Sequence, residues 1–459
     1  MTAVDPAPGE TGSITDPRTY GHGAFDEHHP PDAHLLSDCV HCGFCLPTCP
    51  TYVLWGEEMD SPRGRLYLMK EGLDGAALSE AMVEHWDNCL GCMSCVTACP
   101  SGVRYDTLIE QTRAQVERRH ERSVREKALR GLIFALFPHP RRLRLLRGPL
   151  RALQRTGLDR ALRRTGLLDR MSPHLAAMER LTPPLQPAER LARVVPATGT
   201  RRARVGMITG CVQGAFFPEV NAATARVLAA EGCDVVVPPS QGCCGALSVH
   251  NGREEEAQAY ARSVIDTFER TGVEYVVINA AGCGSTLKDY ARLLADDPAY
   301  AERAEDFQGK VRDIAEILDE LGPVAPRHPL PLTVAYHDAC HLAHAQGVRA
   351  QPRRLLAGIP GLEVREIANP ELCCGSAGIY NILHPEAAAE LGERKAATIV
   401  DTGAEVLVTA NPGCLLQVTS SIAARGHSMG MAHLVEVLDA SIRGLAPDRL
   451  RSARSTNPS

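Results

Sequence analysis

The sequence has no long apolar run and no recognisable nucleotide-binding loop. Its longest apolar stretch, Leu132 to Phe137, is six residues long, whereas a membrane-spanning helix needs roughly 18. The first thirty residues lack the apolar core of a secretory signal, so we expect a cytoplasmic protein. No glycine-rich loop follows a predicted strand, and no Ser-His-Asp arrangement is present. The sequence therefore predicts neither a nucleotide site nor catalytic residues of its own.

Aromatic residues are also scarce, at 4% of the 459 residues, but 44% apolar and 23% charged residues suffice for the cores of about three globular domains. The net charge of −6 argues against nucleic acid as a partner. Cysteine, in contrast, is abundant, with 17 residues. In a long chain without a secretory signal, an odd number of clustered thiols indicates metal ligands rather than disulfides.

The first eight cysteines form two identical runs of the pattern C-x2-C-x2-C-x3-C-P. Three thiolates at this spacing bind one [4Fe–4S] cluster, and the fourth cysteine of each run crosses to the other cluster. Zinc is the alternative, but it favours paired C-x2-C units. The pattern predicts one cluster on Cys39, Cys42, Cys45 and Cys99 (cluster 1) and another on Cys89, Cys92, Cys95 and Cys49 (cluster 2).

The 39 residues between the two runs read as helical. Ser61 and Pro62 are a typical helix start, with serine as the N-cap and proline at the first helical position. Arg63 and Arg65 follow, and two interpretations stay open: the side chains lie beside an anionic cluster, or they belong to a solvated helix start. We expect a mostly helical ferredoxin domain.

The remaining cysteines, apart from Cys233, form an internal repeat. A single cysteine, a Cys-Cys-Gly doublet and a second single cysteine recur with offsets of 129 to 131 residues, which indicates duplication. Cys233 stands outside the pattern and is expected to be a buried structural thiol. The two sets are candidate metal ligands: Cys211, Cys243, Cys244 and Cys283 (the first quartet) and Cys340, Cys373, Cys374 and Cys414 (the second quartet).

Short apolar strands alternate with helices in both repeats, which predicts parallel α/β halves. The predicted strands are 205–209, 234–237 and 275–279, and then 333–336, 363–367 and 406–409; the predicted helices include 221–231, 254–270, 351–356 and 385–401. Each quartet cysteine follows the end of a strand. Because the carboxyl ends of parallel strands share one edge of a sheet, we expect each quartet to converge there. His337, Asp338 and His341 flank Cys340, and we expect them to hydrogen-bond a thiolate.

The segment from Arg118 to Arg170 holds 16 basic and four acidic residues. Leu143, Leu146, Leu150 and Leu153 recur in it at helical spacing. A basic amphipathic helix of this kind suits an anionic membrane surface. An acidic partner subunit, or a solvated connector, explains the pattern as well.

The predicted fold class is α/β with a helical N-terminal part. The predicted organisation is a mobile leader (1–34), a dicluster ferredoxin domain (35–117), a basic helical linker (118–200), two cysteine-rich repeats (201–325 and 326–445) and a mobile tail (446–459).

These motifs, in this order, carry a family resemblance. The doublets resemble the cysteine-rich domain of heterodisulfide reductases, and the whole order resembles the glycolate oxidase iron–sulfur subunits over nearly the entire chain. The matching segments are 39–45 (CVHCGFC), 62–65 (PRGR), 100–105 (PSGVRY), 221–228 (NAATARVL), 242–246 (GCCGA), 372–378 (LCCGSAG) and 408–414 (VTANPGC). The heterodisulfide reductase motif ends in C-x-x-C, but the closing positions here are Thr286 and Gln417, so a five-thiolate cluster is not expected.

The resemblance implies an electron-transfer subunit without catalytic residues of its own. It would take electrons from an FAD-containing subunit that oxidises glycolate to glyoxylate and pass them towards quinone, with possible contact to the membrane through the basic linker. It implies two [4Fe–4S] clusters, with one or two more in the repeats as an open question. The alternatives are the same role in oxidation of lactate or glycerol 3-phosphate, and a heterodisulfide reductase-like catalytic subunit.

Overall fold

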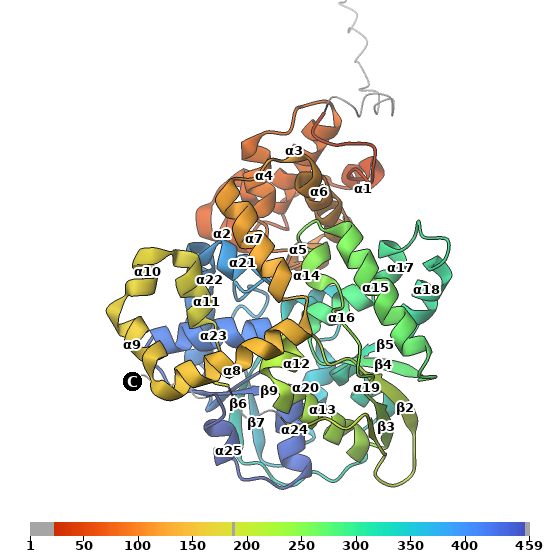
Figure 1. Ribbon diagram of the computed structural model, residues 1–459, viewed down its shortest axis with the longest axis vertical. Helices are drawn as coiled ribbons and strands as arrows, with labels where there is room; N and C mark the ends of the chain where they lie inside the picture. Colours follow the sequence, from red (N-terminus) through yellow and green to blue (C-terminus); the bar gives the residue numbers. More distant parts are fainter. Residues whose placement is uncertain (1–22, 186–188, 455–459) are drawn as a thin grey trace, which may run out of the picture.

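A computed structural model describes residues 23–185 and 189–454. It places a helical N-terminal domain on top of two α/β repeats, with linker helices across the front (Figure 1). The predicted fold class is therefore confirmed. Residues 1–22 of the predicted leader and residues 455–459 of the predicted tail lie outside the described residues.

The N-terminal domain is helical throughout, and residues 23–119 contain no strand. The Ser61 hydroxyl accepts a hydrogen bond from the amide of Gly64 at 3.0 Å, which caps the expected helix. Trp86 and Met69 are fully buried at the centre of the domain. Its helices are α1 (Ala33–Ser37), α2 (Pro50–Trp55), the 3-10 turn η2 (Glu58–Asp60), α3 (Pro62–Leu73), α4 (Glu80–Asp87), α5 (Ser94–Ala98) and α6 (Tyr105–Arg119).

Residues 23–34, predicted as part of a mobile leader, are packed against this domain. Phe25 is buried against Trp86, with ring centroids 5.7 Å apart. His29 lies 2.8 Å from a carboxylate oxygen of Glu254 in the first repeat. Further ion pairs join Asp26 to Arg118 and His29 to Asp296. The glycine- and proline-rich composition of the segment gave no sign of these contacts, which depend on residues distant in sequence.

Each repeat contains one sheet. The first has the strand order β1-β3-β2-β4-β5, with β1 alone antiparallel, and the second has the all-parallel order β7-β6-β8-β9. The strands are β1 (Val194–Val195), β2 (Ala203–Met207), β3 (Cys233–Val236), β4 (Tyr275–Ile278), β5 (Val311–Asp313), β6 (Leu332–His337), β7 (Leu362–Glu366), β8 (Val406–Thr409) and β9 (Gly430–His433). All six predicted strands are present. The edge strands β1, β5 and β9 were not predicted, because they are short and, for β5 and β9, hold few β-branched residues.

One hydrophobic core runs through both repeats. Arg226 on α13 binds Asp439 on α24 at 2.8 Å and ties the repeats together. The first repeat contains α12 (Val212–Phe216), α13 (Pro218–Ala230), α14 (Ala246–Val249), α15 (Glu254–Glu269), α16 (Ala281–Leu287), α17 (Tyr290–Leu293), α18 (Ala301–Lys310) and α19 (Ile314–Leu321). The second contains the π-helical turn η3 (His341–Ala345), α20 (Ala350–Ala357), α21 (Tyr380–Leu383), α22 (Pro385–Val400), α23 (Pro412–Ala424), α24 (Leu434–Ile442) and α25 (Asp448–Arg451).

The predicted mobile tail is packed as far as Arg454. Leu450 on α25 is buried, and the Arg454 guanidinium binds Glu436 at 2.7 Å. Cys233 is fully buried at the start of β3, as expected of a structural thiol.

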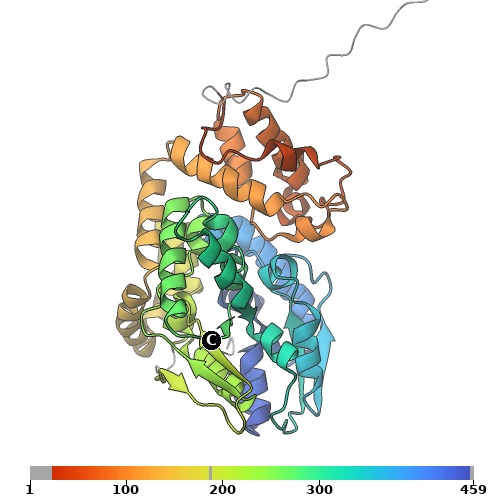
Figure 2. The same ribbon diagram turned by 90° about the vertical axis from the view of Figure 1, so that its right-hand side faces the viewer.

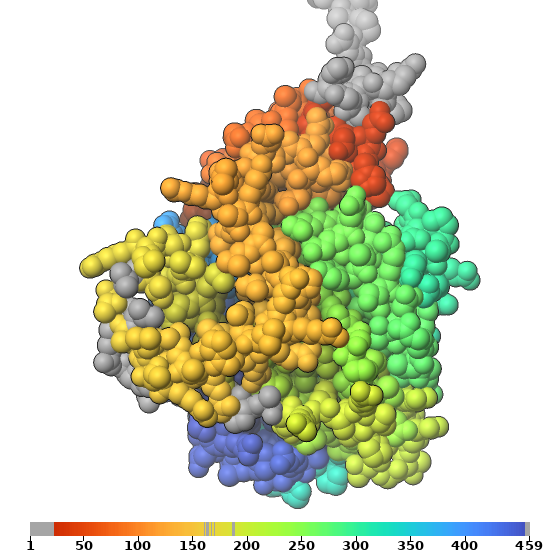
Figure 3. Space-filling view, in the orientation of Figure 1, coloured from red at the N-terminus to blue at the C-terminus, as the bar shows by residue number. Residues whose placement is uncertain are grey.

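The linker helices lie across the front of the repeats (Figures 1 and 3), while the N-terminal domain rests on one end (Figure 2). They are α7 (Val124–Leu136), α8 (Pro140–Thr156), α9 (Leu158–Thr165), α10 (Leu167–Met171) and α11 (Pro173–Arg180). Leu143 is buried, and α8 packs on α12. Within residues 23–185 and 189–454, no helix combines the length and the apolar character that crossing a membrane requires.

Candidate metal centres

The two ferredoxin runs wrap around two small cavities. In both runs, the second and fourth residues after the first cysteine adopt the left-handed conformation: His41 and Gly43 in one, Gly91 and Met93 in the other. These reversals turn successive thiols towards a common point. One cavity is lined by Cys39, Cys42, Cys45 and Cys99, and the other by Cys49, Cys89 and Cys92, while Cys95 lines both.

This grouping is the one that crossed ligation requires. Cys49 faces the cavity of the second run, and Cys99 faces the cavity of the first. The ligand assignment itself stays a prediction, and the grouping of the thiols supports it. Each cavity thus has the four cysteine sulfurs of its predicted set, which is the donor set that [4Fe–4S] clusters use.

Arg65 lies beside these thiols rather than in solvent. It is 1% exposed, and its guanidinium lies 3.9 Å from the sulfur of Cys49 and 3.0 Å from Asp60. Burial raises the pKa of Cys89, but Arg65 and Arg113 outweigh burial and hold that pKa below its ordinary value. Arg65 therefore stabilises negative charge at cluster 2. Arg65 therefore lies beside a cluster site and does not belong to a solvated helix start.

Arg63 lies nearer cluster 1 and is partly exposed. It binds Glu58 at 2.6 Å and donates to the carbonyl oxygen of His41 at 3.0 Å, inside the loop between Cys39 and Cys42. Burial raises the pKa of Cys39, and the charge of Arg63 acts against that rise.

The quartet thiols converge as their spacing predicts. In the first repeat, the sulfurs of Cys211 and Cys243 lie 3.9 Å apart, and Cys244 contacts Cys283. In the second, Cys340 contacts Cys373, and Cys374 contacts Cys414. A hydrogen bond from one neighbouring thiol acts to lower the pKa of each doublet thiol, but the hydrogen bond to the next thiol, together with burial, raises it overall. Bound metal supplies the positive charge that thiolates need in such a site.

Both quartets open into one cavity of about 1400 Å³. Its other walls include Cys89 of the N-terminal domain and Leu143, Leu146 and Leu150 of α8. The leucine side of α8 therefore faces the repeats, and the arginines at its start are exposed.

The residues around the second quartet are more polar than those around the first. The imidazole of His337 lies within 4.8 Å of the sulfurs of Cys374 and Cys414. It is 2% exposed, and neither ring nitrogen has a hydrogen-bond partner among residues 23–185 and 189–454. Burial, with the nearby Lys395, lowers the pKa of His337 to about 3. The neutral imidazole is thus the form present at neutral pH.

Lys395 was missed by the sequence reasoning. It is 1% exposed on α22, donates to the carbonyl oxygen of Asn369 at 3.0 Å and lies near the thiols of Cys373, Cys374 and Cys414. Burial lowers the pKa of Lys395. Its position one turn after Leu391, on the apolar side of a predicted helix, is the signal that was available.

The other two polar residues near Cys340, His341 and Asp338, differ in their contacts with its thiol. His341 lies 3.6 Å from the sulfur of Cys340 and is placed to hydrogen-bond it, as expected. Asp338 instead forms an ion pair with Arg353 at 2.7 Å.

The N-terminal domain touches the second repeat through a cluster thiol. Cys92 packs in one apolar group with Cys373, Tyr380 and Leu391. Burial, followed by the charge of Cys340, raises the pKa of Cys92, so the two thiols interact electrostatically. Cluster 2 and the second quartet are therefore direct neighbours.

A buried histidine holds this contact. The imidazole of His344 on η3 binds Thr97 at 2.6 Å and Ser94 at 3.1 Å, both on α5.

The first repeat meets the N-terminal domain through charges instead. Glu110 on α6 binds His250 at 2.9 Å and also pairs with Arg292. Although burial acts to raise the pKa of Glu110, these two partners hold it at about 2.

The positions that replace the fifth cysteine are occupied by satisfied polar side chains. Gln417 donates to the carbonyl oxygen of Ala388 at 2.8 Å and accepts from Asn381 at 3.0 Å. The Thr286 hydroxyl bonds to the carbonyl oxygen of Gly282 at 3.5 Å. Neither side chain offers a sulfur to its quartet.

Family models match along most of the chain. Residues 35–103 match a 4Fe-4S dicluster domain, residues 205–288 and 334–419 each match a cysteine-rich domain, and residues 125–182 match the linker region of the glycolate oxidase iron-sulfur subunit. The chain is therefore an iron–sulfur protein, and its basic linker is a family feature.

Similar proteins cover the same range. The chain is 39% identical to the probable glycolate oxidase iron-sulfur subunit of Bacillus subtilis and 36% identical to the glycolate oxidase iron-sulfur subunit of Escherichia coli, in each case over 89% of this chain and 94% of the relative. It is 32% identical to lactate utilization protein A of an Exiguobacterium species, over 52% of this chain and 98% of that protein.

Proposed function

Because the chain belongs to the glycolate oxidase iron–sulfur subunit family, we propose that it transfers electrons within a glycolate-oxidising complex. Oxidation of glycolate to glyoxylate releases two electrons and two protons. An FAD-containing partner subunit takes up both electrons, and this chain passes them singly to a quinone, which takes two electrons and two protons. Iron–sulfur clusters, when bound, supply such one-electron chemistry.

The observation that carries this proposal is the contact between successive thiol sites. Cys95 lines both ferredoxin cavities, and Cys92 packs against Cys373 of the second quartet. The sites for cluster 1, cluster 2 and the second quartet thus follow one another without a gap. The chain holds them in order, and Cys92 and the second-quartet doublet are buried.

The outer end of this series lies at the loop of Cys42, which is exposed. Val40 and Phe44, on either side of it, are 68% and 65% exposed. Adjacent exposed apolar side chains at a redox site suit docking of a protein partner. We place the flavin subunit over this loop.

The partner is tested by co-purification and reduction. The flavoprotein that purifies with the full-length chain is mixed with glycolate under anaerobic conditions, and bleaching of the iron–sulfur absorbance is followed. We expect glycolate to reduce the complex and the flavin-free chain to oxidise nothing. Reduction by lactate but not glycolate would assign the complex to lactate, and turnover of either acid by the isolated chain would disprove the electron-transfer role.

Phe44→Asp sharpens this test. It should slow reduction of the clusters by the flavin partner while leaving the iron content unchanged. Val324→Asp, at an exposed residue outside the cysteine motifs, is the control.

A heterodisulfide reductase activity is not favoured. Thr286 and Gln417 hold the positions of the fifth thiols and use their polar atoms in hydrogen bonds within the repeats. An assay of heterodisulfide reduction by the isolated chain tests this alternative, and activity there would support it.

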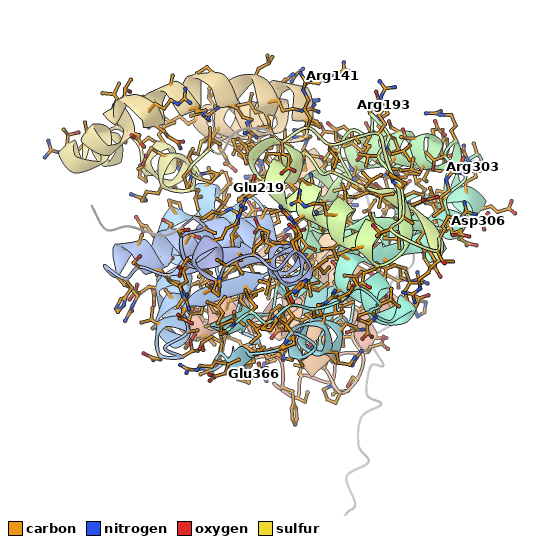
Figure 4. The ribbon with its side chains drawn as sticks, turned by 90° about the horizontal axis from the view of Figure 1, so that it is seen from below. Arg141, Arg193, Glu219, Arg303, Asp306 and Glu366 are labelled. Carbon is orange, nitrogen blue, oxygen red and sulfur yellow. The ribbon has the colours of Figure 1, made fainter. Side chains whose placement is uncertain are left out.

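For the location, we propose a cytoplasmic protein that binds peripherally to an anionic membrane. Leu143, Leu146 and Leu150 of α8 line the inner cavity. The proposed contact is therefore mainly electrostatic and uses the exposed side chains of Arg141, Arg142 and Arg144 (Figure 4 shows Arg141 at the outer edge of the molecule). Co-sedimentation with anionic vesicles should fall steeply between low and physiological salt. Binding that resists high salt would contradict the electrostatic contact.

A further inference from the structure

His337 is a buried imidazole for which the established motifs give no role. Both its ring nitrogens lack a hydrogen-bond partner within the described residues, although the side chain is 2% exposed. Buried polar atoms are almost always satisfied, and an unsatisfied one calls for an explanation such as an ion. His337 is the last residue of β6 and pairs with Thr409 of β8. Cys340 and Cys414 follow these two strand ends along the chain.

The neighbours of the imidazole are metal-ligating atoms. One ring nitrogen and the sulfurs of Cys374 and Cys414 all lie within 4.8 Å of one another. Imidazole and thiolate together suit iron and zinc, and neither suits the hard ions magnesium and calcium. The other conceivable donor, a fifth cysteine at Gln417, is absent.

The first repeat lacks this donor. The offset of 129 residues between Cys340 and Cys211 places Ile208 where the second repeat has His337. Ile208 is buried in an apolar group with Cys211, Cys243 and Cys244. The sulfur quartet is common to both repeats, whereas the nitrogen donor belongs to one.

The two repeats also differ in a buried lysine. The offset of 131 residues between Cys414 and Cys283 places Val264 where the second repeat has Lys395. Lys395 and Val264 are 1% and 2% exposed. A centre ligated by several thiolates carries net negative charge, and a buried charge needs a partner of opposite sign. Only the second quartet has this lysine as a partner.

We propose that His337 is a nitrogen ligand of an iron centre in the second repeat, bound together with Cys374 and Cys414, and that the first quartet binds no equivalent centre. The inference deepens the proposed electron-transfer function, because Cys373 and Cys340 place this centre beside Cys92 of cluster 2. It rests on that function only for the choice of iron over zinc.

The test uses the full-length chain, reconstituted anaerobically with iron and sulfide, and measures metal binding rather than turnover. His337→Ile introduces the residue of the first repeat. We expect it to lose the iron of the second repeat and to keep the iron of the two ferredoxin clusters. Pulsed paramagnetic resonance of the dithionite-reduced wild type should show nitrogen hyperfine couplings that change with ¹⁵N-histidine labelling and vanish in His337→Ile.

Two further variants keep the proposal falsifiable if His337→Ile folds poorly. His337→Cys replaces nitrogen by sulfur, so it should retain iron and lose the nitrogen couplings. His341→Asn, next to Cys340, is the matched control and should keep both. Unchanged iron and couplings in His337→Ile, loss of the couplings in His341→Asn instead, or zinc in place of iron in the wild type would each overturn the proposal.

Failure of this inference is distinguishable from failure of the proposed function. If His337→Ile loses the nitrogen-ligated iron but glycolate does not reduce the complex, the ligand assignment stands and the function is wrong. If glycolate reduces the complex and His337→Ile keeps all of its iron and nitrogen couplings, the proposed function stands and the ligand assignment is wrong.

Discussion

The two cysteine-rich repeats present the same four sulfurs in different surroundings. In the first, the doublet lies among apolar side chains such as Ile208 and Val264, and the contact with the ferredoxin domain is an ionic group around Glu110. In the second, His337 and Lys395 lie beside the thiols, and the contact with the ferredoxin domain is made by Cys92 itself. Duplication thus kept the thiol geometry, while the neighbouring residues separated the roles. The electron-transfer role proposed above assigns the series of redox sites to the second repeat and a supporting role in the assembly to the first.

The largest effect should come from removing one sulfur of each doublet in turn. Cys373→Ala removes a thiol that contacts both Cys340 and Cys92, so electron transfer from the reduced flavin partner should fall more than about tenfold, together with the iron of the second repeat. Cys243→Ala should leave the iron content unchanged and the rate within about twofold. Stopped-flow reduction and iron analysis check both. Equal losses in the two variants would remove the distinction between the repeats.

A second pair of variants tests which cluster adjoins the second repeat. Cys99→Ser should damage cluster 1, and Cys49→Ser should damage cluster 2, because each thiol faces the cavity of the other run. Only Cys49→Ser should abolish the magnetic interaction between a ferredoxin cluster and the second-repeat centre in paramagnetic resonance spectra. If Cys99→Ser affected the cluster of its own run instead, the crossed ligation would be wrong.

The third comparison concerns the buried cation. Lys395→Met preserves the length of the side chain and removes its charge, so the reduction potential of the second-repeat centre should fall by on the order of 100 mV, for one charge several ångström away at an effective dielectric constant of about 20. Val264→Met at the equivalent position of the first repeat should leave every potential unchanged. Spectroscopic redox titration measures both. A potential that stays constant in Lys395→Met would show that the lysine only ties α22 to the carbonyl oxygens of Asn369 and Pro370.

The sequence predicted the features of this comparison that depend on short-range spacing. The two ferredoxin runs, the six inner strands and the convergence of the quartets follow from local pattern and from the rule that parallel strands end at one edge. The roles of Arg65 and Lys395 depend on tertiary packing, because a basic residue on a predicted helix is normally solvated. The packing of Phe25 and of the leucine side of α8 against the rest of the chain also depends on tertiary contacts, so it was not predicted.

The ionic contact of the first repeat should matter for stability and little for electron transfer. Glu110→Gln leaves the partly exposed Arg292 with Asp289 as its remaining carboxylate partner. The free energy of unfolding should therefore fall by about 2 kcal/mol, less than breaking a fully buried ion pair costs. Anaerobic urea unfolding measures this change. The rate of electron transfer, normalised to folded protein, should stay within about twofold of the wild type. A large loss of rate would mean that the first repeat also belongs to the redox path.

The smallest expected effect concerns a buried tyrosine of each repeat. Here the first repeat, not the second, has the tyrosine hydroxyl that forms a hydrogen bond. The Tyr290 hydroxyl donates to the carbonyl oxygen of Cys244 at 2.8 Å, whereas the buried Tyr380 hydroxyl, near Cys373 in the second repeat, has no partner within the described residues. Tyr290→Phe should therefore lower the free energy of unfolding by about 1 kcal/mol, and Tyr380→Phe should change it by less than about 0.5 kcal/mol.

Urea unfolding of the iron-free and iron-loaded chains separates two causes. If Tyr380→Phe is neutral without iron but costs as much as Tyr290→Phe with iron, the hydroxyl donates to a ligand sulfur of the bound centre, and the second repeat differs from the first in one more contact. If Tyr380→Phe is costly in both forms, the hydroxyl has a partner that does not depend on metal, and the polar character of the second repeat is structural at this position.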